Sequence, residues 1–309
     1  MSKILVTGSR GTLGVPLVEE LKKRGHDVFG LDLQHNEDPK CARANIQNIR
    51  ELEQMFERFG HFDYVYHLAA EFGRNNGEDY YESLWKTNAV GTKHLLTLQE
   101  RGFFDRMIFA SSSEVYGEGH GEIALTEELP DESPLFHYND YAMSKWVNER
   151  QIRNHRTRTG KEVMTLRFFN AYGPGEHYHR YRSVVCLFCY QALMGEGFTV
   201  YKDYHRVFMY IDDFTPTLAN VVDNFVDGET VNIGGEEYRS VEDLAEIVIK
   251  ETGLDPSKVT YLEQESHNVQ NKRPDILKAK RMFNHSPSIR LEEGIRNTLD
   301  WMREEYGFR

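Results

Sequence analysis

Three glycines near the start of the chain restrict its fold more than any other feature. Gly8, Gly11 and Gly14 follow a short apolar run at 4–6 and precede a segment with helical apolar spacing. In the order strand, glycine turn and helix, glycines let the backbone approach a pyrophosphate, and the helix start offers free N–H groups. We therefore expect a dinucleotide to bind at Gly8, Arg10, Gly11, Thr12, Leu13 and Gly14.

The next strand-like run, 27–33, ends near Asp32. A carboxylate at this position can accept both ribose hydroxyls of the adenosine and would repel a 2′-phosphate, which favours NAD over NADP. Arg10 argues the other way, because a guanidinium in the glycine loop could reach a 2′-phosphate. We expect NAD, and Arg10 keeps NADP open.

Strand-like and helical segments alternate through the first half of the chain. This rhythm predicts an α/β fold with a doubly wound parallel sheet, a Rossmann fold. The alternation weakens after the run 170–175, so we expect a smaller, interleaved C-terminal substrate-binding lobe. The predicted boundaries are 1–170 for the dinucleotide-binding domain, with returning elements at about 206–233, and 171–309 for the substrate-binding lobe.

Composition excludes several classes of partner. The formal net charge of −12 argues against broad binding to nucleic acid or to an anionic membrane. No apolar run approaches the roughly 20 residues that span a bilayer, and Met1 leads into the first strand without a signal peptide, so we expect a cytoplasmic protein. Cys186 and Cys189 lack the second pair that a zinc site needs, and we expect no metal.

Tyr141 and Lys145 are the candidate catalytic pair. The helical pattern around them places residues four apart on one face. An ammonium near a phenol lowers the pKa of the tyrosine, which could then act as a general base near neutral pH. Ser112, Ser113 and Glu114 follow a predicted strand at 106–110, at the carboxyl end where open α/β sheets bind ligands.

Taken together, these stretches resemble the extended short-chain dehydrogenase/reductase family of nucleotide-sugar epimerases, dehydratases and decarboxylases. The likeness covers nearly the whole chain, and its motifs agree in order and spacing. With the glycine loop, the implied cofactor site comprises Asp32, Asn45, Ile46, Leu68, Ala69, Ala70, Asn88, Tyr141 and Lys145. The implied contacts to a nucleotide-diphosphate sugar are Ser112, Asn170, Arg182, Arg206 and Arg273, with both Arg206 and Arg273 at the diphosphate.

The resemblance also implies the chemistry. A phenolate at Tyr141 would take the proton of the sugar 4-hydroxyl while hydride passes to the nicotinamide, which gives a 4-keto intermediate. Ser112 would hydrogen-bond the same oxygen. In a dehydratase, Glu114 would take the C5 proton. Ser113 stands where some dehydratases carry an acidic residue and resembles other dehydratases and the decarboxylases better.

We therefore expect an NAD-dependent lyase, with 4,6-dehydration slightly ahead of decarboxylation. C4 epimerisation is the main alternative. A non-catalytic NAD(H)-sensing protein and a net dehydrogenase are further alternatives, and the intact Ser112, Tyr141 and Lys145 set argues against the sensor. The resemblance also implies a homodimer.

Overall fold

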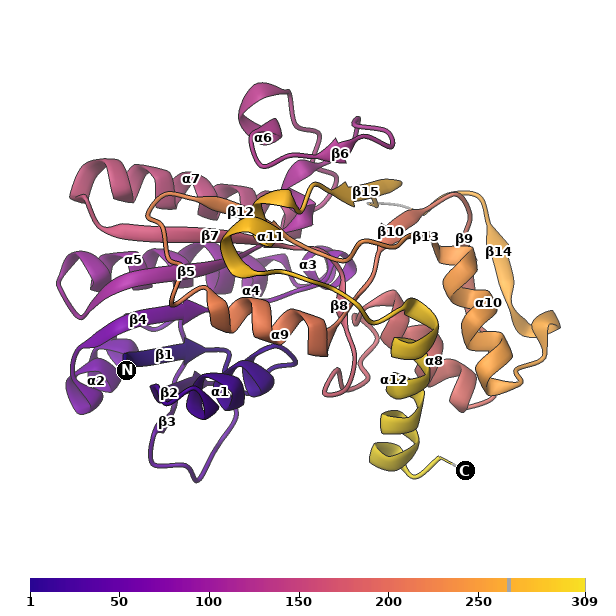
Figure 1. Ribbon diagram of the computed structural model, residues 1–309, viewed down its shortest axis with the longest axis horizontal. Coiled ribbons are helices and arrows are strands. Elements are labelled where there is room, and N and C mark those ends of the chain that lie inside the picture. Colours follow the sequence, from indigo (N-terminus) through magenta and orange to yellow (C-terminus); the bar gives the residue numbers. More distant parts are fainter. Residues whose placement is uncertain (266–267, 309) are drawn as a thin grey trace.

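The computed structural model describes residues 1–265 and 268–308, and its larger part is built on one parallel sheet (Figure 1). The strands of this sheet are β1 (Lys3–Thr7), β2 (Asp27–Asp32), β3 (Cys41–Arg43), β4 (Phe62–His67), β5 (Phe104–Ser112), β7 (Glu162–Phe168) and β12 (Thr230–Ile233). Their order is β12-β7-β5-β4-β1-β2-β3, and all neighbours pair in parallel. The predicted doubly wound α/β fold is confirmed.

Helices cover both faces of this sheet because alternate strand residues point to opposite sides. Leu5 packs in a cluster with α2 (Ile49–Phe59), α5 (Thr92–Glu100) and α7 (Asp140–Thr159). Ile4 and Val6 belong to the cluster on the other face, which includes side chains of three further helices. These are α1 (Gly14–Lys23), α9 (Ile211–Asn220) and α11 (Leu277–Phe283).

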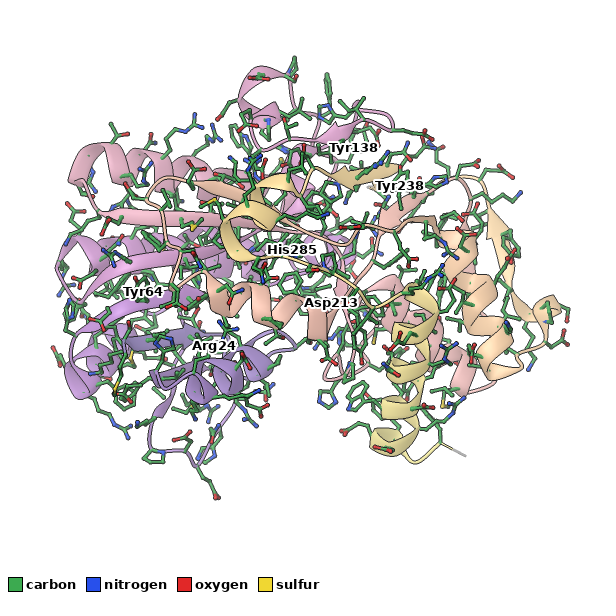
Figure 2. All side chains as sticks on the ribbon, in the orientation of Figure 1. Arg24, Tyr64, Tyr138, Asp213, Tyr238 and His285 are labelled. Carbon is green, nitrogen blue, oxygen red and sulfur yellow. The ribbon has the colours of Figure 1, made fainter. Side chains whose placement is uncertain are left out.

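Polar contacts fix α9 against the first half of the chain (Figure 2). Arg24 follows α1 and donates from Nη1 to Asn220 Oδ1 at 2.7 Å. The Tyr66 hydroxyl donates to the Leu218 carbonyl at 2.8 Å, and the Tyr64 hydroxyl donates to the Val222 carbonyl. A helix from the second half of the chain is thus built into the layer that covers the first strands.

The smaller lobe lies beside the carboxyl ends of the large sheet (Figure 1). Its core is formed by α8 (Val184–Leu193), α10 (Val241–Thr252) and α12 (Leu291–Tyr306). Next to this core lie a β14-β9 pair and a four-stranded sheet of order β13-β10-β15-β6. These strands are β6 (Ala124–Leu125), β9 (Thr199–Tyr201), β10 (His205–Val207), β13 (Tyr238–Ser240), β14 (Thr260–Leu262) and β15 (Asn271–Pro274).

The chain passes between the two parts several times. α9 and β12 return to the large sheet, as does α11 much later, whereas β10 pairs in the sheet of the smaller lobe. A division between 170 and 171 stays a prediction, and residue 309 lies outside the described residues. Among the described helices, none combines the length and the apolar character that a bilayer crossing requires.

Candidate active site

A cavity of about 1070 Å³ lies at the carboxyl ends of the large sheet and extends to the smaller lobe. It brings together residues from distant parts of the sequence, and most of the predicted site residues line it. These are Gly8, Gly11, Thr12, Leu13, Gly14, Asp32, Asn45, Ile46, Leu68, Ala69, Ala70, Ser112, Ser113, Glu114, Tyr141, Lys145, Asn170, Arg182 and Arg206. Arg10, Asn88 and Arg273 are not part of the lining.

The glycine loop is too tightly packed for side chains at two of its positions. Gly8 has φ of +71°, and a Cβ there would lie 2.9 Å from the Ala69 nitrogen. At Gly14 a Cβ would lie 2.0 Å from the Gly8 carbonyl oxygen. The loop therefore brings bare backbone and the start of α1 to the cavity, which suits the pyrophosphate of a dinucleotide.

Asp32 lines the same cavity from the carboxyl end of β2. Its Oδ2 accepts from the Arg10 backbone N–H at 2.9 Å and its Oδ1 from the Gln34 N–H at 3.0 Å. These bonds orient the carboxylate at the end of β2, where an adenosine ribose of NAD would lie. Arg10 contributes its backbone here, and its exposed side chain does not line the cavity.

Asn88 shapes the site without lining it. It lies in a π-helical turn, Lys86–Gly91, and is buried. Its Oδ1 accepts from the Glu71 N–H at 2.9 Å, and its Nδ2 donates to the Glu71 carbonyl at 3.0 Å and to Ser144 Oγ at 3.0 Å. Asn88 therefore connects the loop after β4 to the helix that carries Tyr141, and its predicted direct contact with the cofactor stays a prediction.

Tyr141 and Lys145 both face the cavity from the first turns of α7. Asn139 caps this helix by accepting from the Ala142 N–H at 2.8 Å. Burial raises the pKa of Tyr141 to about 12, partly offset by a hydrogen bond with Ser112. Burial lowers the pKa of Lys145 to about 8, and its Nζ donates to the Ala110 carbonyl at 2.8 Å.

The direction of this shift in the tyrosine pKa is opposite to the lowering that the Tyr141–Lys145 spacing predicted. The reason is that loss of solvent outweighs the other effects on the phenol, while the Lys145 ammonium is bonded to the strand carbonyl. The side chains of the cavity alone therefore favour the protonated phenol near neutral pH. A positive charge bound beside it would favour the phenolate, and the oxidised nicotinamide of NAD carries such a charge.

Glu114 is paired with a lysine that sequence analysis missed. Ser112 ends β5, and its Oγ accepts from the Glu114 N–H at 3.2 Å. Glu114 Oε1 forms an ion pair with Lys272 Nζ, whereas its buried Oε2 has no hydrogen-bond partner among the described residues. Burial would raise the pKa of Glu114, but Lys272 and Arg74 together lower it to about 2. Glu114 is thus a firmly ionised carboxylate.

The register of β15 decides which basic residue enters the cavity. Lys272 pairs with Arg206 of β10, and both side chains are buried. Arg273, the next residue, points to the opposite face, is exposed, and lies over the Tyr238 ring at 5.9 Å. The structure thus places Lys272, and not the predicted Arg273, in the cavity, because adjacent strand residues alternate in direction. The only hint in the sequence was that Lys272 directly precedes the predicted Arg273 in the same short segment.

The other two predicted substrate contacts, Arg182 and Asn170, already interact with other parts of the protein. Arg182 lies over the Phe72 ring at 4.5 Å, and its Nε donates to the His177 carbonyl. Asn170 has φ of 37°, and its Nδ2 donates to the Val207 carbonyl at 3.0 Å. Both line the cavity, and their roles as substrate contacts stay predictions.

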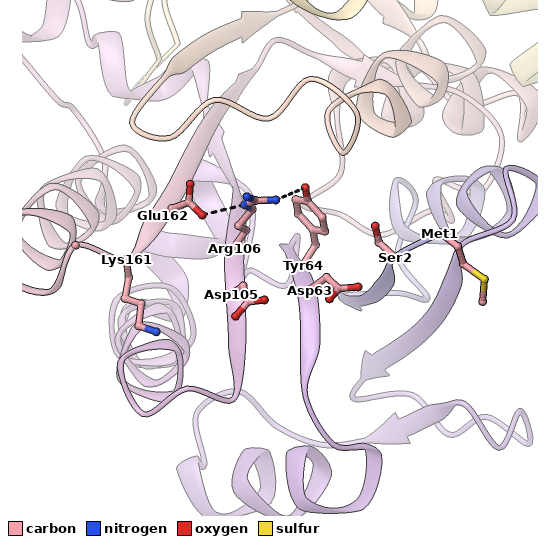
Figure 3. Close-up of a pocket in the computed structure, with 9 residues that line it drawn as sticks. Met1, Ser2, Asp63, Tyr64, Asp105, Arg106, Lys161 and Glu162 are labelled. Carbon is pink, nitrogen blue, oxygen red and sulfur yellow. Dashed lines mark hydrogen bonds and ion pairs between the residues drawn. The ribbon is translucent and has the colours of Figure 1, made fainter.

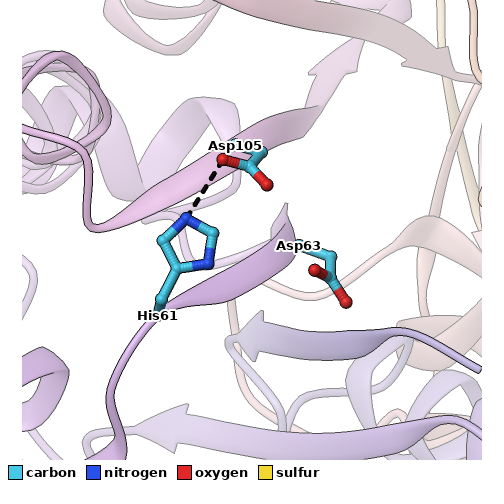
Figure 4. Close-up of side chains that lie close together, drawn as sticks. All are labelled: His61, Asp63 and Asp105. Atoms are coloured by element: carbon cyan, nitrogen blue, oxygen red, sulfur yellow. Dashed lines mark hydrogen bonds and ion pairs between the residues drawn. The ribbon is translucent and has the colours of Figure 1, made fainter.

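A second, smaller cavity of about 570 Å³ lies at the amino ends of β4 and β5, away from the residues described above (Figure 3). Its lining includes Arg106, which donates to Glu162 and Tyr64. Asp63 and Asp105 also line it, and together with His61 they form the one group of possible metal ligands found in the described ranges (Figure 4).

The three side chains of this possible metal-binding group already form hydrogen bonds with one another or with nearby backbone. His61 Nε2 lies 3.0 Å from Asp105 Oδ1, and Asp63 Oδ2 accepts from the Lys3 N–H at 2.6 Å. Neither His61 nor the two carboxylates line the larger cavity. They therefore add nothing to the site built around Tyr141.

Comparison with known proteins agrees with this geometry. Residues 4–234 match the model of the NAD dependent epimerase/dehydratase family. The UDP-N-acetyl-alpha-D-glucosaminuronate decarboxylase of Bacillus cytotoxicus is 30% identical, with 98% of each chain covered. UDP-glucuronic acid decarboxylase 1 of Xenopus tropicalis is also 30% identical over 98% of this chain and 72% of its own.

Solved structures show the same fold. The UDP-glucose 4-epimerase of Thermotoga maritima with UDP-glucose has a TM-score of 0.89 and 25% identity, with 98% of this chain and 99% of that chain covered. The UDP-glucuronic acid 4-epimerase of Bacillus cereus, in complex with UDP-glucuronic acid and NAD, has a TM-score of 0.84 and 26% identity over 98% and 100% of the two chains. The chain belongs to the NAD dependent epimerase/dehydratase family.

Proposed function

We propose that this protein is an NAD-dependent lyase that decarboxylates a nucleotide-linked uronic acid through a 4-keto intermediate. The observation that carries the proposal is the ion pair between Glu114 and Lys272 in the cavity that Tyr141 lines. It bears directly on the choice between dehydration, decarboxylation and epimerisation.

Dehydration needs a base that removes the C5 proton. Glu114 is the carboxylate expected for that step, but a carboxylate with a pKa of about 2 is a poor base at neutral pH. The sequence alone put dehydration slightly ahead. The Lys272 ammonium on Glu114 favours decarboxylation instead, because that reaction needs no base at C5.

Decarboxylation uses the groups that the cavity provides. NAD held at the glycine loop and Asp32 would supply the chemistry of hydride removal from C4 and its return. Tyr141 takes the proton of the 4-hydroxyl, and Ser112 holds the same oxygen. The 4-ketone lies β to the C6 carboxylate, so the C5–C6 bond breaks, its electrons move toward the ketone oxygen, and carbon dioxide leaves. Lys272 then donates a proton to C5, which restores the ketone, and solvent reprotonates Lys272. Tyr141 returns its proton to the C4 oxygen as the ketone is reduced.

Epimerisation at C4 is the second candidate, because the similar Bacillus cereus structure is a UDP-glucuronic acid 4-epimerase. The decarboxylase relatives are more similar in sequence and cover this chain as fully. A homodimer, which the family resemblance implies, and the expected cytoplasmic location belong to the proposal as well. Ser112, Tyr141 and Lys145 together in one cavity argue against a purely NAD(H)-sensing protein.

Product mass separates these reactions. We expect the protein with NAD to convert UDP-glucuronate, or a related nucleotide-linked uronate, to a product lighter by carbon dioxide, with no net change in NAD. Mass spectrometry of the nucleotide sugars is the measurement. A product of unchanged mass would establish epimerisation, loss of water would establish dehydration, and accumulation of NADH would establish a net dehydrogenase. Any of these three results alone would contradict decarboxylation.

The pH dependence of turnover tests Lys272. Burial lowers its pKa to about 8, with Glu114 acting to raise it. A lysine is protonated below its pKa, so turnover should fall above about pH 8 as Lys272 loses the proton that it donates. In Lys272→Arg turnover should fall at every pH, because a guanidinium holds its proton too tightly to donate it, and the residual turnover should lack the alkaline limb that Lys272 sets. The measurement is kcat against pH for both proteins.

Lys145 has a pKa of about 8 as well, which makes the comparison informative. An alkaline limb that stays in place in Lys272→Arg would assign the titration to Lys145. Lys272→Met provides the control, because it removes the donor at every pH. Full turnover by Lys272→Met would contradict the assigned role.

A further inference from the structure

One end of the cavity holds more positive than negative charge. Arg74, Arg206 and Lys272 lie there with Glu114 and Glu265, and all five line the cavity. Lys272 pairs with Glu114, and Arg74 Nη2 lies 3.4 Å from Glu265 Oε1. These two pairs leave one cation in excess. An excess buried charge is costly, and a bound anion would compensate it.

Arg206 is already committed to the protein. Its Nη1 donates to the carbonyls of His205 at 2.7 Å and Gln270 at 2.6 Å. Its Nη2 donates to Asn268 Oδ1 at 2.8 Å and also to the Val269 carbonyl. Four bonds to neutral oxygens hold the guanidinium in place without neutralising it. It can attract an anion through its charge, but binding one with both of its Nη groups would break contacts that fix β10 to the chain before β15.

Arg74 differs because part of its guanidinium is free. Nη2 faces Glu265, but Nη1 is buried and has no hydrogen-bond partner among the described residues. A buried N–H donor without a partner costs about as much as a lost hydrogen bond, so such groups are rare unless a ligand completes them. Arg74 Nη1 is thus a donor prepared for an acceptor in the cavity.

The position of Arg74 is fixed relative to the catalytic helix. It begins the short helix α3 (Arg74–Asp79), whose Glu78 accepts from the Asp140 N–H at 3.0 Å. Gly77 of this helix packs so closely that a Cβ there would lie 3.4 Å from the Tyr141 nitrogen. Arg74 also lies near enough to Glu114 to lower the pKa of that carboxyl. It therefore reaches the part of the cavity where the reacting carbons of a sugar would lie.

We propose that Arg74 binds the C6 carboxylate of the substrate and makes the enzyme selective for nucleotide-linked uronic acids over neutral hexoses. The inference rests on the proposed function in taking a nucleotide sugar as the ligand. Tyr141 must contact the oxygen on C4, which places C5 and C6 nearby, toward Glu114 and Arg74. A carboxylate there gives Nη1 an acceptor and neutralises the excess charge. A neutral hydroxymethyl group supplies no negative charge and leaves that excess uncompensated.

Binding measurements with three ligands test this. Calorimetry on NAD-saturated protein in a Tyr141→Phe background, which prevents turnover, gives the Kd of UDP-glucuronate, UDP-glucose and UDP. We expect UDP-glucuronate to bind at least about tenfold more tightly than UDP-glucose. Arg74→Gln should weaken UDP-glucuronate roughly 30-fold, since a hydrogen bond between charged groups is lost, and should change the other two by less than about twofold.

Two variants make the result specific. Glu265→Gln removes the competing carboxylate from Nη2 and should tighten UDP-glucuronate binding. Arg58→Gln is the matched control for loss of one positive charge, because Arg58 is exposed near the end of α2, outside the cavity lining. It should leave all three affinities unchanged. Arg74→Lys retains the positive charge and should lose less affinity for UDP-glucuronate than Arg74→Gln does.

The contrary outcomes are distinct. An equal loss of affinity for all three ligands in Arg74→Gln would place Arg74 at the diphosphate. That result would overturn the inference, while the proposed function would stand. Unchanged binding of UDP-glucuronate would overturn the inference in the same way. If none of the ligands bound with Arg74 intact, both the inference and the choice of UDP-linked substrates would fail.

Discussion

Tyr141→Phe will reduce turnover by at least about 1,000-fold while the protein still binds NAD. General acid–base catalysis by a positioned group contributes roughly 10²- to 10⁴-fold, and the phenol oxygen is the group placed to take the 4-hydroxyl proton. The substitution removes one oxygen from the side chain and leaves the ring in place. The measurement is kcat with a nucleotide-linked uronate, together with NAD affinity by calorimetry.

The control for this variant removes the hydroxyl of a different tyrosine that lines the same cavity. Tyr181 is half-buried, lines the cavity and donates to Asp79, so Tyr181→Phe removes a phenol oxygen at the same cavity that is bonded to neither Ser112 nor Lys145. It should keep most of the turnover. A fully active Tyr141→Phe variant would show that another group removes the proton, and the proposed mechanism would be abandoned.

Glu149→Gln will lower the free energy of unfolding by about 3 kcal/mol, the largest stability effect that we expect from one isosteric change. Glu149 and Arg167 are 6% and 2% exposed, and their two contacts measure 3.0 and 2.8 Å. Glu149 Oε1 also accepts from Ser111 Oγ at 2.6 Å. The neutral amide would leave the Arg167 charge buried without a counter-charge. Urea unfolding followed by circular dichroism measures the change.

Two controls separate charge from packing. The double variant Glu149→Leu with Arg167→Met removes both charges and should recover much of the lost stability, because no uncompensated ion remains. The exposed Arg158–Glu100 pair, with contacts of 2.7 Å, is the matched surface case. Glu100→Gln should move the urea midpoint little, since solvent screens that pair. A Glu149→Gln midpoint close to that of the wild type would contradict the expectation.

Much of the fold and the cofactor half of the site could be predicted from the sequence. The strand, glycine turn and helix around Gly8 and Gly14 form a local pattern, and Asp32 follows it at a strand end. Local patterns of this kind depend on residues close in the chain, and the family, the parallel sheet and NAD as cofactor are confirmed. The individual roles of the site residues stay predictions.

The substrate half could not be predicted because it depends on register and on side-chain competition. Whether Lys272 or Arg273 enters the cavity depends on how a four-residue strand aligns with β10. Whether the Arg206 guanidinium is available to a ligand depends on the oxygen atoms at 268–270 that it contacts, about 60 positions away in the sequence. Arg74 gave no signal because it begins a short polar helix, α3, whose position is set by contacts with α7.

The repeated crossing of the chain between its two parts limits how such enzymes can be recombined. A fragment that stopped at residue 170 would lack α9, β12 and α11, so β7 would become an unpaired sheet edge and the apolar side chains under α9 would meet water. Exchanging sugar-recognition halves between relatives by a single splice would therefore break the nucleotide half as well. New substrate preferences are more accessible through point changes at positions such as Arg74 and Lys272 than through shuffled modules.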